Sequence, residues 1–235
     1  MAQFKYAGHL LPRKLPIEQL RKFASLAQEA ARSIPSMILY RQHQLEWTEK
    51  DWTEVLADER LHWVVCTAVM EDTTTTTNTL EGRWVGLLSL RGPLSDVMAR
   101  ELQLQSHSVD ENGAQVPCWA ASRLFIKARH RGSSEAIEQL FAASRRTVAK
   151  VSVGHRIVAV FSTVAGNVED SVLHQYYAAT GCETVGHISY RGSLYLYGEL
   201  DRLPEDIRAN ISDTESKLLL RFRWEIRDEE QSPET

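Results

Sequence analysis

Hydrophobic residues recur at three- and four-residue spacing after Pro16, which predicts an amphipathic helix that ends near Pro35. The recurring positions are Leu20, Phe23, Ala24, Leu26, Ala27 and Ala31. A second, short helix is predicted after Thr48, with Trp52, Val55 and Leu56 facing inward. Two apolar stretches, residues 61–70 and 83–90, then predict strands of a sheet that is covered on both faces.

The second half of the chain alternates between strand and helix patterns. Residues 118–126 predict a strand, and the helix after it has a buried stripe made of Ala136, Ile137, Leu140, Phe141, Ser144 and Val148. The apolar run 156–164 predicts an interior parallel strand, and a helix over about 170–180 is expected to end at Gly181. Residues 183–190 and 193–200 are expected to form an antiparallel hairpin around the turn Arg191-Gly192.

Three segments lie outside this regular pattern. Residues 92–115 are polar and predict an insertion, either an ordinary one or a substrate lid, with a short helix around residues 97–104. The apolar piece 218–226 is expected to cover a sheet edge, and the charged residues 227–235 are expected to be disordered. The threonine tract over residues 73–77 predicts a hairpin loop without chemistry.

Composition narrows the class of protein. A chain of 235 residues with 43% hydrophobic content can bury one sizeable core, and we expect one domain over residues 1–235. A net charge near −4 gives no indication of nucleic acid or an anionic membrane as partner. The three cysteines lack the spacing of metal ligands and suit a reducing compartment: Cys66, Cys118 and Cys182. We therefore expect the protein in the cytoplasm, and a nuclear location is left open. No run of apolar residues predicts a membrane span or a signal peptide.

The most informative stretch is the turn between the strand at 118–126 and the following helix. Its sequence is Arg129-His130-Arg131-Gly132-Ser133-Ser134. A glycine among small hydroxyl residues lets successive backbone N–H groups approach an anion, and the start of a helix adds unpaired donors and a positive dipole end. We call residues 129–134 the phosphate turn, and a diphosphate is its expected ligand.

The order of elements, together with this turn, resembles the GNAT superfamily of acyl-CoA-dependent N-acetyltransferases over roughly residues 61–200. The resemblance implies a mixed α/β fold with a central twisted sheet of about six or seven strands flanked by helices. The family's pyrophosphate motif is Arg or Gln, two variable residues, Gly, one variable residue, then Gly or Ala. A start at Arg129 puts Gly132 at the first Gly position and keeps the apolar stripe of the next helix inward, whereas a start at Arg131 would turn Glu135 and Gln139 toward the core.

In this register Ser134 replaces the second Gly or Ala, and Glu135 must face solvent or pair with a neighbouring cation. The resemblance implies that residues of the strand and the turn hold acetyl-CoA as co-substrate. These cofactor-binding residues are Ser122, Leu124, Arg129, His130, Arg131, Gly132, Ser133 and Ser134, with Asn167 added from the loop before the next helix. No metal is expected.

The family often protonates the departing thiolate with a Tyr four residues before a Gly. Here that pattern is Tyr177-Ala178-Ala179-Thr180-Gly181, so Tyr177 is the expected catalytic residue. Where many relatives carry a Glu base on the strand, this chain has Cys118, a poor base unless its pKa is lowered. Water, His187, or an acid of the insertion, Asp110 or Glu111, is left as the alternative base.

The acceptor pocket is expected to involve the N-terminal helices over residues 16–57, the insertion and the last hairpin. Its candidate aromatic residues are Tyr40, Trp47, Trp52, Trp63, Tyr190 and Tyr195, although each alone is as easily a core residue. The resulting hypothesis is an enzyme that transfers an acetyl group from acetyl-CoA to a primary amine of a small molecule by direct attack in a ternary complex. Two alternatives are a non-catalytic acyl-CoA-binding module and a protein lysine or N-terminal acetyltransferase, and a homodimer is left open.

Overall fold

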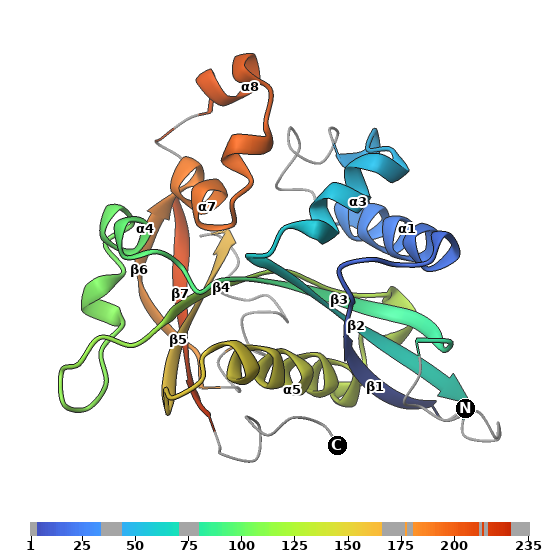
Figure 1. Cartoon of the computed structure of the whole chain (residues 1–235), viewed down its shortest axis with the longest axis horizontal. Helices are drawn as coiled ribbons and strands as arrows, with labels where there is room; N and C mark the ends of the chain where they lie inside the picture. The colour runs from blue at the N-terminus through green and yellow to red at the C-terminus, as the bar shows by residue number, and fades with distance from the viewer. Residues whose placement is uncertain are drawn as a thin grey trace. The chain divides into compact units, whose positions relative to one another are not determined.

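Seven strands form one sheet in the described part of the chain, in the spatial order β1-β2-β3-β4-β5-β7-β6. The structure is a computed structural model that describes residues 4–33, 44–70, 80–165, 177, 181–211, 213 and 216–226. The strands are β1 (Phe4–Leu10), β2 (Leu61–Met70), β3 (Arg83–Arg91), β4 (Cys118–Ile126), β5 (Ile157–Ala165), β6 (Glu183–Ser189) and β7 (Ser216–Glu225) (Figure 1). β4 and β5 are parallel, whereas β1 with β2, β5 with β7 and β6 with β7 are antiparallel. The predicted mixed sheet of six or seven strands is therefore confirmed.

Helices connect these strands. They are α1 (Ile17–Ser33), α3 (Glu49–Ala57), α4 (Asp96–Glu101), α5 (Ser134–Val151), α7 (Tyr190–Leu196) and α8 (Glu205–Ala209), with short 3₁₀ turns η1 (Gln105–His107), η2 (Ala128–His130) and η3 (Leu200–Arg202). Thr48 caps α3 as the sequence predicts, because its hydroxyl accepts from the N–H of Asp51 while the Asp51 carboxylate accepts from the N–H of Thr48. No helix in the described part of the chain is both long and apolar enough to cross a membrane.

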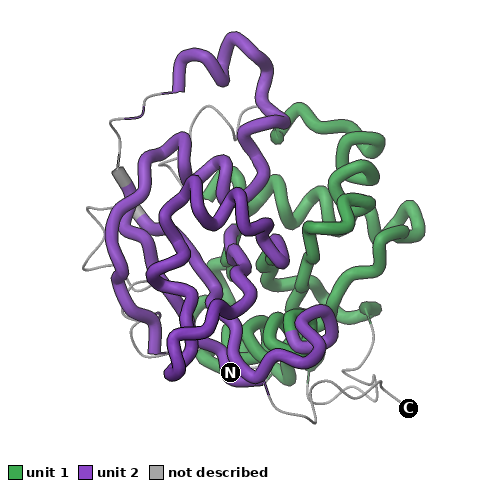
Figure 2. The backbone as a smooth tube through the Cα atoms, turned by 60° about the vertical axis from the view of Figure 1, so that its left-hand side comes forward, with its two compact units in different colours: residues 1–90, 123–148 green, residues 91–122, 149–235 purple. Residues whose placement is uncertain are grey.

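The contacts divide the chain into two compact units (Figure 2). Unit 1 contains residues 1–90 and 123–148, and unit 2 contains residues 91–122 and 149–235. The division falls within β4, whose first five residues belong to unit 2 and whose last four belong to unit 1.

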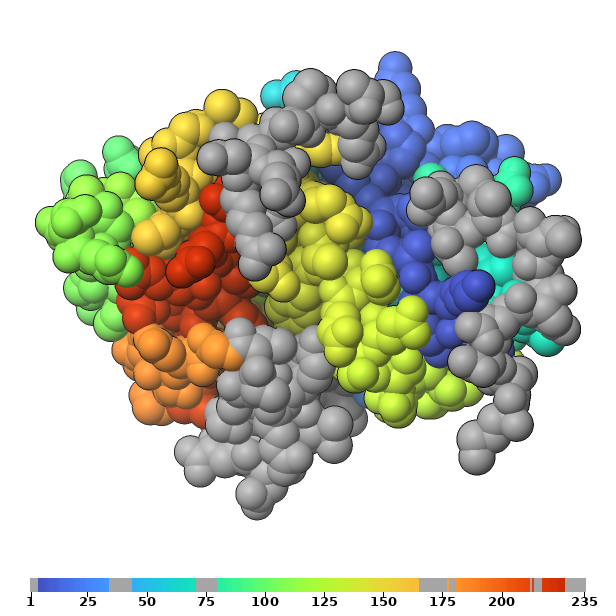
Figure 3. Space-filling view, turned by 90° about the horizontal axis from the view of Figure 1, so that it is seen from below, coloured from blue at the N-terminus to red at the C-terminus, as the bar shows by residue number. Residues whose placement is uncertain are grey.

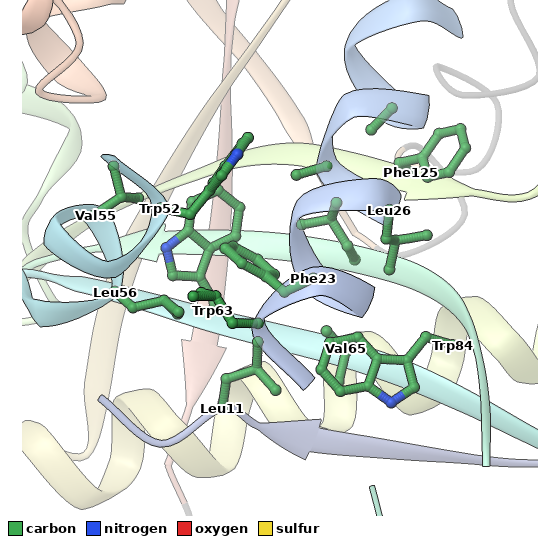
Figure 4. Packing of buried hydrophobic residues seen from close by; sticks show 14 of the residues in the cluster. Leu11, Phe23, Leu26, Trp52, Val55, Leu56, Trp63, Val65, Trp84 and Phe125 are labelled. Carbon is green, nitrogen blue, oxygen red and sulfur yellow. The ribbon is translucent and has the colours of Figure 1, made fainter. Parts of the chain in front are cut away.

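The core of unit 1 packs α1 and α3 against the sheet. Phe23 of α1 meets the indole rings of Trp52 and Trp63 edge to face, with ring centroids 5.4 and 4.9 Å apart (Figure 4). Trp52 and Trp63 are each only 1% exposed. These two tryptophans are thus core residues, which is the alternative that the sequence analysis left open for each of them.

α5 packs on β1 in unit 1 at Gly8, a position where only glycine fits. A Cβ on Gly8 would overlap the carbonyl oxygen of Gln139 and lie 2.8 Å from the Cβ of Ala143. On β3, a Cβ on Gly86 would lie 2.5 Å from Cδ1 of Ile126 on β4 and 3.2 Å from Cδ1 of Leu140 on α5. β1 and α5 therefore approach closely enough for backbone contact at Gly8, which positions α5 relative to β1.

The core of unit 2 joins the first half of β4 to β5, β6, β7 and α7. Buried residues from these elements, from α4 and from the segments that follow α4 and α7 form one cluster: Ala99, Leu104, Cys118, Ala120, Ala159, Phe161, Ile188, Leu196, Tyr197 and Leu219. The Tyr197 hydroxyl donates to the Thr163 hydroxyl at 3.0 Å, so this buried phenol is hydrogen-bonded.

One strand was missed by the sequence analysis, and two of its predictions about strands are wrong. β1 is a seven-residue strand that the sequence pattern did not indicate. Residues 193–200 are not a strand, because the hydroxyl of Ser189 caps helix α7 at the N–H of Gly192. β7 does not cover an edge but lies inside the sheet between β5 and β6. The predictions of a helix around residues 170–180 and of disorder over residues 227–235 fall, apart from Tyr177, on residues outside the described ones.

Candidate functional site

The strand β4 changes character halfway along its length. Residues 118–121 are buried, whereas Ser122, Arg123 and Leu124 are partly exposed in succession. Arg123 has a φ of 57°, which is the left-handed region, and its guanidinium carbon lies 4.8 Å from the ring centroid of Trp63. A left-handed residue departs from extended strand geometry, so the backbone of β4 is irregular at Arg123, between Ser122 and Leu124.

The phosphate turn starts directly after β4. The N–H of His130 donates to the carbonyl of Lys127 at 2.8 Å, the N–H of Arg131 to Ala128 at 3.3 Å and the N–H of Ser133 to His130 at 3.1 Å. α5 then begins at Ser134, and the N–H groups of its first turn, on Ser134, Glu135 and Ala136, have no partner within a helix. The N–H of Gly132 makes no backbone hydrogen bond in the described part of the chain.

The side chains of the turn have different environments. Arg129 and Ser134 are exposed, as is Glu135, so this carboxylate faces solvent as the sequence reading required. The Nε of Arg131 donates to the last carbonyl of β4, on Ile126, at 2.9 Å. His130 is 2% exposed, and its ring lies among aromatic side chains of β1 instead of facing outward.

Gly132 has no internal reason to be glycine. Its φ is outside the left-handed region, and an added Cβ would meet nothing within 4 Å. Neither backbone strain nor crowding therefore demands the missing side chain. A ligand that approaches the backbone closely would demand it.

The predicted catalytic residue Tyr177 lies in unit 2. It is 5% exposed, and its ring centroid lies 5.2 Å from that of Phe222 on β7, edge to face. Its carbonyl accepts from the N–H of Cys182, and Gly181 between them has a φ of 76°, as expected for the glycine that ends a helix. The described residues do not include Asn167, so its role stays a prediction.

Of the residues considered as the base, Cys118, Asp110 and Glu111 are engaged elsewhere or exposed, whereas His187 lies in the pocket described below. Burial raises the pKa of Cys118, whose thiol donates to the hydroxyl of Ser108 at 2.9 Å, so it stays protonated at neutral pH. The carboxylate of Asp110 accepts from the N–H groups of Asn112 and Ala114 and shapes a loop. Glu111 lies 3.6 Å from Arg223 in an exposed ion pair.

A pocket of about 580 Å³ lies in unit 2 between the insertion, β6 and α7. Its polar residues are Glu101, Gln103, His107, His187, Ser189, Arg191 and Tyr195, and its apolar residues include Leu102, Val185, Ile188, Leu200 and Leu219. The hydroxyl of Tyr195 donates to the carboxylate of Glu101 at 2.7 Å, which raises the pKa of this tyrosine. The sequence analysis named Tyr195 and His187 but missed Glu101. Nothing in the sequence distinguishes this residue from any other carboxylate at the end of a short helix.

The sequence has no significant match to any protein-family model or curated protein. Among solved structures, Arabidopsis thaliana NAA60 in complex with acetyl-CoA is similar at a TM-score of 0.54 and 11% identity, over 93% of this chain and 98% of that one. The same protein in complex with a bisubstrate analogue has a TM-score of 0.50 and 8% identity, over 93% of this chain and 99% of that one. A Vibrio cholerae spermidine N-acetyltransferase SpeG chimera has a TM-score of 0.49 and 12% identity, over 92% of this chain and 93% of that one.

The chain therefore has the fold of the GNAT N-acetyltransferases, as its sequence predicts.

Proposed function

We propose that this protein is an N-acetyltransferase that transfers the acetyl group of acetyl-CoA to a primary amine of a small molecule. The observation that carries the proposal is the open backbone at Gly132, at the junction of β4 and α5 in a chain with the GNAT fold. The N–H groups of Gly132 and of the first turn of α5 would bind the diphosphate of CoA, and the helix dipole favours its negative charge. Arg129 is exposed and would add a positive charge.

The chemistry needs one proton donor and one proton acceptor. The amine nitrogen attacks the thioester carbon, the C–S bond breaks, the thiolate takes a proton and the new amide nitrogen loses one. We assign Tyr177 as the donor. A phenol with a pKa near 10 gives its proton to an alkyl thiolate with a pKa near 8.5 at a cost of roughly 2 kcal/mol, which is small beside an acyl-transfer barrier. Cys118 does not serve as the base, because burial raises its pKa, and we propose that water takes the proton from the amine.

We assign the amine to the pocket in unit 2. Its volume suits a small molecule rather than a folded protein surface, and the carboxylate of Glu101 would attract an ammonium group. We further propose a cytoplasmic location, which the three free thiols of Cys66, Cys118 and Cys182 support.

Calorimetry and a transfer assay test the proposal together. Acetyl-CoA should bind, and a panel of primary amines that includes polyamines, aminoglycosides and N-terminal peptides should contain acceptors of low molecular weight. Glu101→Gln should raise the KM for a cationic amine about tenfold without changing the affinity for acetyl-CoA. Glu111→Gln, which removes a carboxylate of the same insertion outside the pocket, is the control.

The outcomes separate the competing functions. Acetyl-CoA binding without transfer to any amine would support the non-catalytic module. Transfer confined to peptides would replace the small-molecule acceptor with a protein. Absence of acetyl-CoA binding would overturn the proposed function.

A further inference from the structure

We propose that strand β1 anchors the phosphate turn through His130, and that CoA affinity depends on His130 being neutral. His130 is then a positioning residue, which acts through the backbone of the turn and not by touching the ligand. The inference rests on the proposed function, because it concerns the same turn.

One face of β1 is directed at the turn and at α5. Side chains at alternate positions of a strand share a face, which places Phe4, Tyr6 and Gly8 together. Phe4 and Tyr6 contact His130, and Gly8 is the position where α5 packs against the strand backbone. In Figure 3 the blue residues of β1 lie beside the yellow and yellow-green residues of α5 and the turn. The strand thus holds both the turn and the helix that follows it.

The ring of His130 is fixed on two sides. Its centroid lies 5.1 Å from that of Phe4 and 5.8 Å from that of Tyr6, both edge to face. Its Nδ1 shares a hydrogen bond of 3.1 Å with the Tyr6 hydroxyl. Its Nε2 is buried and has no hydrogen-bond partner among the described residues.

The position of this ring determines the position of the turn. The backbone of His130 is bonded on both sides, since its N–H donates to Lys127 and its carbonyl accepts from Ser133. Gly132, with its open N–H, lies within the turn that the bond from Ser133 to His130 closes. Any movement of the His130 ring out of its site on β1 therefore moves the donor that we assign to the diphosphate.

Protonation of His130 would work against this arrangement. A neutral imidazole that accepts the Tyr6 hydrogen at Nδ1 carries its own proton on Nε2. Protonation occurs at Nδ1, which then no longer accepts from Tyr6, and it places a positive charge on a buried ring whose Nε2 has no acceptor among the described residues. The charged groups that act on the ring are the cations Arg129, Arg83 on β3 and Lys127. Burial and these cations lower the pKa of His130.

The direction of the pH effect follows from this lowered pKa. The neutral form is favoured in the folded protein, so its contribution to stability is complete above the unfolded value of about 6.5 and is lost as the pH falls through the lower, folded pKa. The same protonation should loosen the turn. Affinity for CoA should therefore fall on acidification. A direct contact between an imidazolium and the diphosphate would give the opposite sign, because binding would then favour the protonated ring.

The test is calorimetric titration of CoA between pH 8 and pH 5. The wild type should lose at least about threefold more affinity over this range than His130→Phe, which keeps an aromatic ring and cannot titrate. Titration of the CoA phosphates contributes equally to every variant, so it cancels in this comparison. Replacement of an exposed histidine, His155→Phe, should retain the wild-type pH profile of CoA affinity. Tyr6→Phe, which removes only the hydroxyl, should weaken CoA binding roughly two- to tenfold at pH 7.5.

Amide hydrogen exchange in the absence of CoA separates this proposal from the function on which it rests. In Tyr6→Phe, exchange over residues 127–134 should be faster than in the wild type. Affinity that rises on acidification relative to His130→Phe would overturn the proposal in favour of a direct phosphate contact. Unchanged CoA affinity and unchanged exchange in Tyr6→Phe would reduce His130 to a space-filling residue. If the wild type binds no CoA at any pH, the proposed function fails. The exchange result alone then decides whether β1 anchors the phosphate turn through His130.

Discussion

The substitution Gly132→Ala separates the two reasons for which a chain keeps a glycine. The φ of Gly132 is one that alanine adopts, and the added methyl group would meet nothing within 4 Å. Folding should therefore tolerate the change. It should even raise the free energy of unfolding by about 0.4–1 kcal/mol, because alanine restricts the unfolded chain.

The same methyl group should interfere with CoA. It would stand where the diphosphate approaches the backbone, so the hydrogen bond from the Gly132 N–H to the charged diphosphate would be lost. Such a bond is worth about 1.5–3 kcal/mol, which corresponds to a loss of roughly 10- to 150-fold in affinity. Isothermal titration with CoA measures the affinity, and urea unfolding followed by tryptophan fluorescence measures the stability.

Gly154→Ala is the matched control for this experiment. Gly154 is equally open but has a φ of 84°, so alanine should be strained there by about 1–2 kcal/mol. Gly154→Ala should thus lower stability and leave CoA affinity unchanged, the reverse of Gly132→Ala. Wild-type affinity in Gly132→Ala would refute the assignment of the turn as the diphosphate site.

Three further changes test other parts of the structure. Tyr177→Phe keeps the ring contact with Phe222 and should reduce kcat by about 10²- to 10⁴-fold with unchanged CoA affinity, and a kcat near that of the wild type would exclude Tyr177 as the acid. Gly8→Ala places a methyl group against the backbone of Gln139 and should lower the free energy of unfolding by about 1–3 kcal/mol in urea, whereas an unchanged midpoint would contradict the close packing of β1 on α5. Because burial raises the pKa of Cys118, this thiol should not contribute to the pH–rate profile from pH 6 to 8.5, and Cys118→Ser should keep the wild-type profile; a lost basic limb would identify a thiolate base.

The elements around the phosphate turn could be predicted from the sequence because several local signals agree there. The apolar run that forms β4, the glycine-containing turn and the helical period of α5 each indicate the same boundaries. The capping box at Thr48 is a similar local signal, and the helix starts where it predicts. Agreement of this kind does not depend on distant parts of the chain.

The strands that sequence reasoning missed depend on distant partners. β1 is an edge strand of mostly half-buried residues, and its Gly8 weakens the strand pattern although the packing of α5 requires it. β7 pairs with β5 and β6 on both sides, and nothing near residues 216–225 indicates that position. Pairing order in a sheet is a property of the whole chain, which a local pattern does not contain.

The error at α7 has a local cause. Aromatic Tyr195 and Tyr197 have high strand propensity and favoured a hairpin. Two signals for a helix were nevertheless present: Ser189 as the N-cap, and Gly198, whose φ of 66° follows the last turn. This helix supplies Arg191 and Tyr195 to the pocket, so the error also hid one wall of the proposed amine site.

The candidate site was predicted as a set of residues and not as an arrangement. His130 illustrates the difference, because its place in the motif suggested a contact with the ligand whereas its ring packs against Phe4 and Tyr6. The sequence could not indicate that role without knowledge of β1. Glu101 was missed for the same reason. Its place in the pocket becomes visible only through its hydrogen bond with Tyr195, almost a hundred residues later in the chain.

The most direct test of the account is amide hydrogen exchange of the wild-type protein with and without saturating acetyl-CoA. The open donors of Gly132, Ser134, Glu135 and Ala136 should become protected, because the diphosphate would occupy them. The exchange at Gly113, on the exposed insertion loop, should not change. Unchanged exchange across residues 131–136 in the presence of acetyl-CoA would contradict the proposal that this turn binds the cofactor.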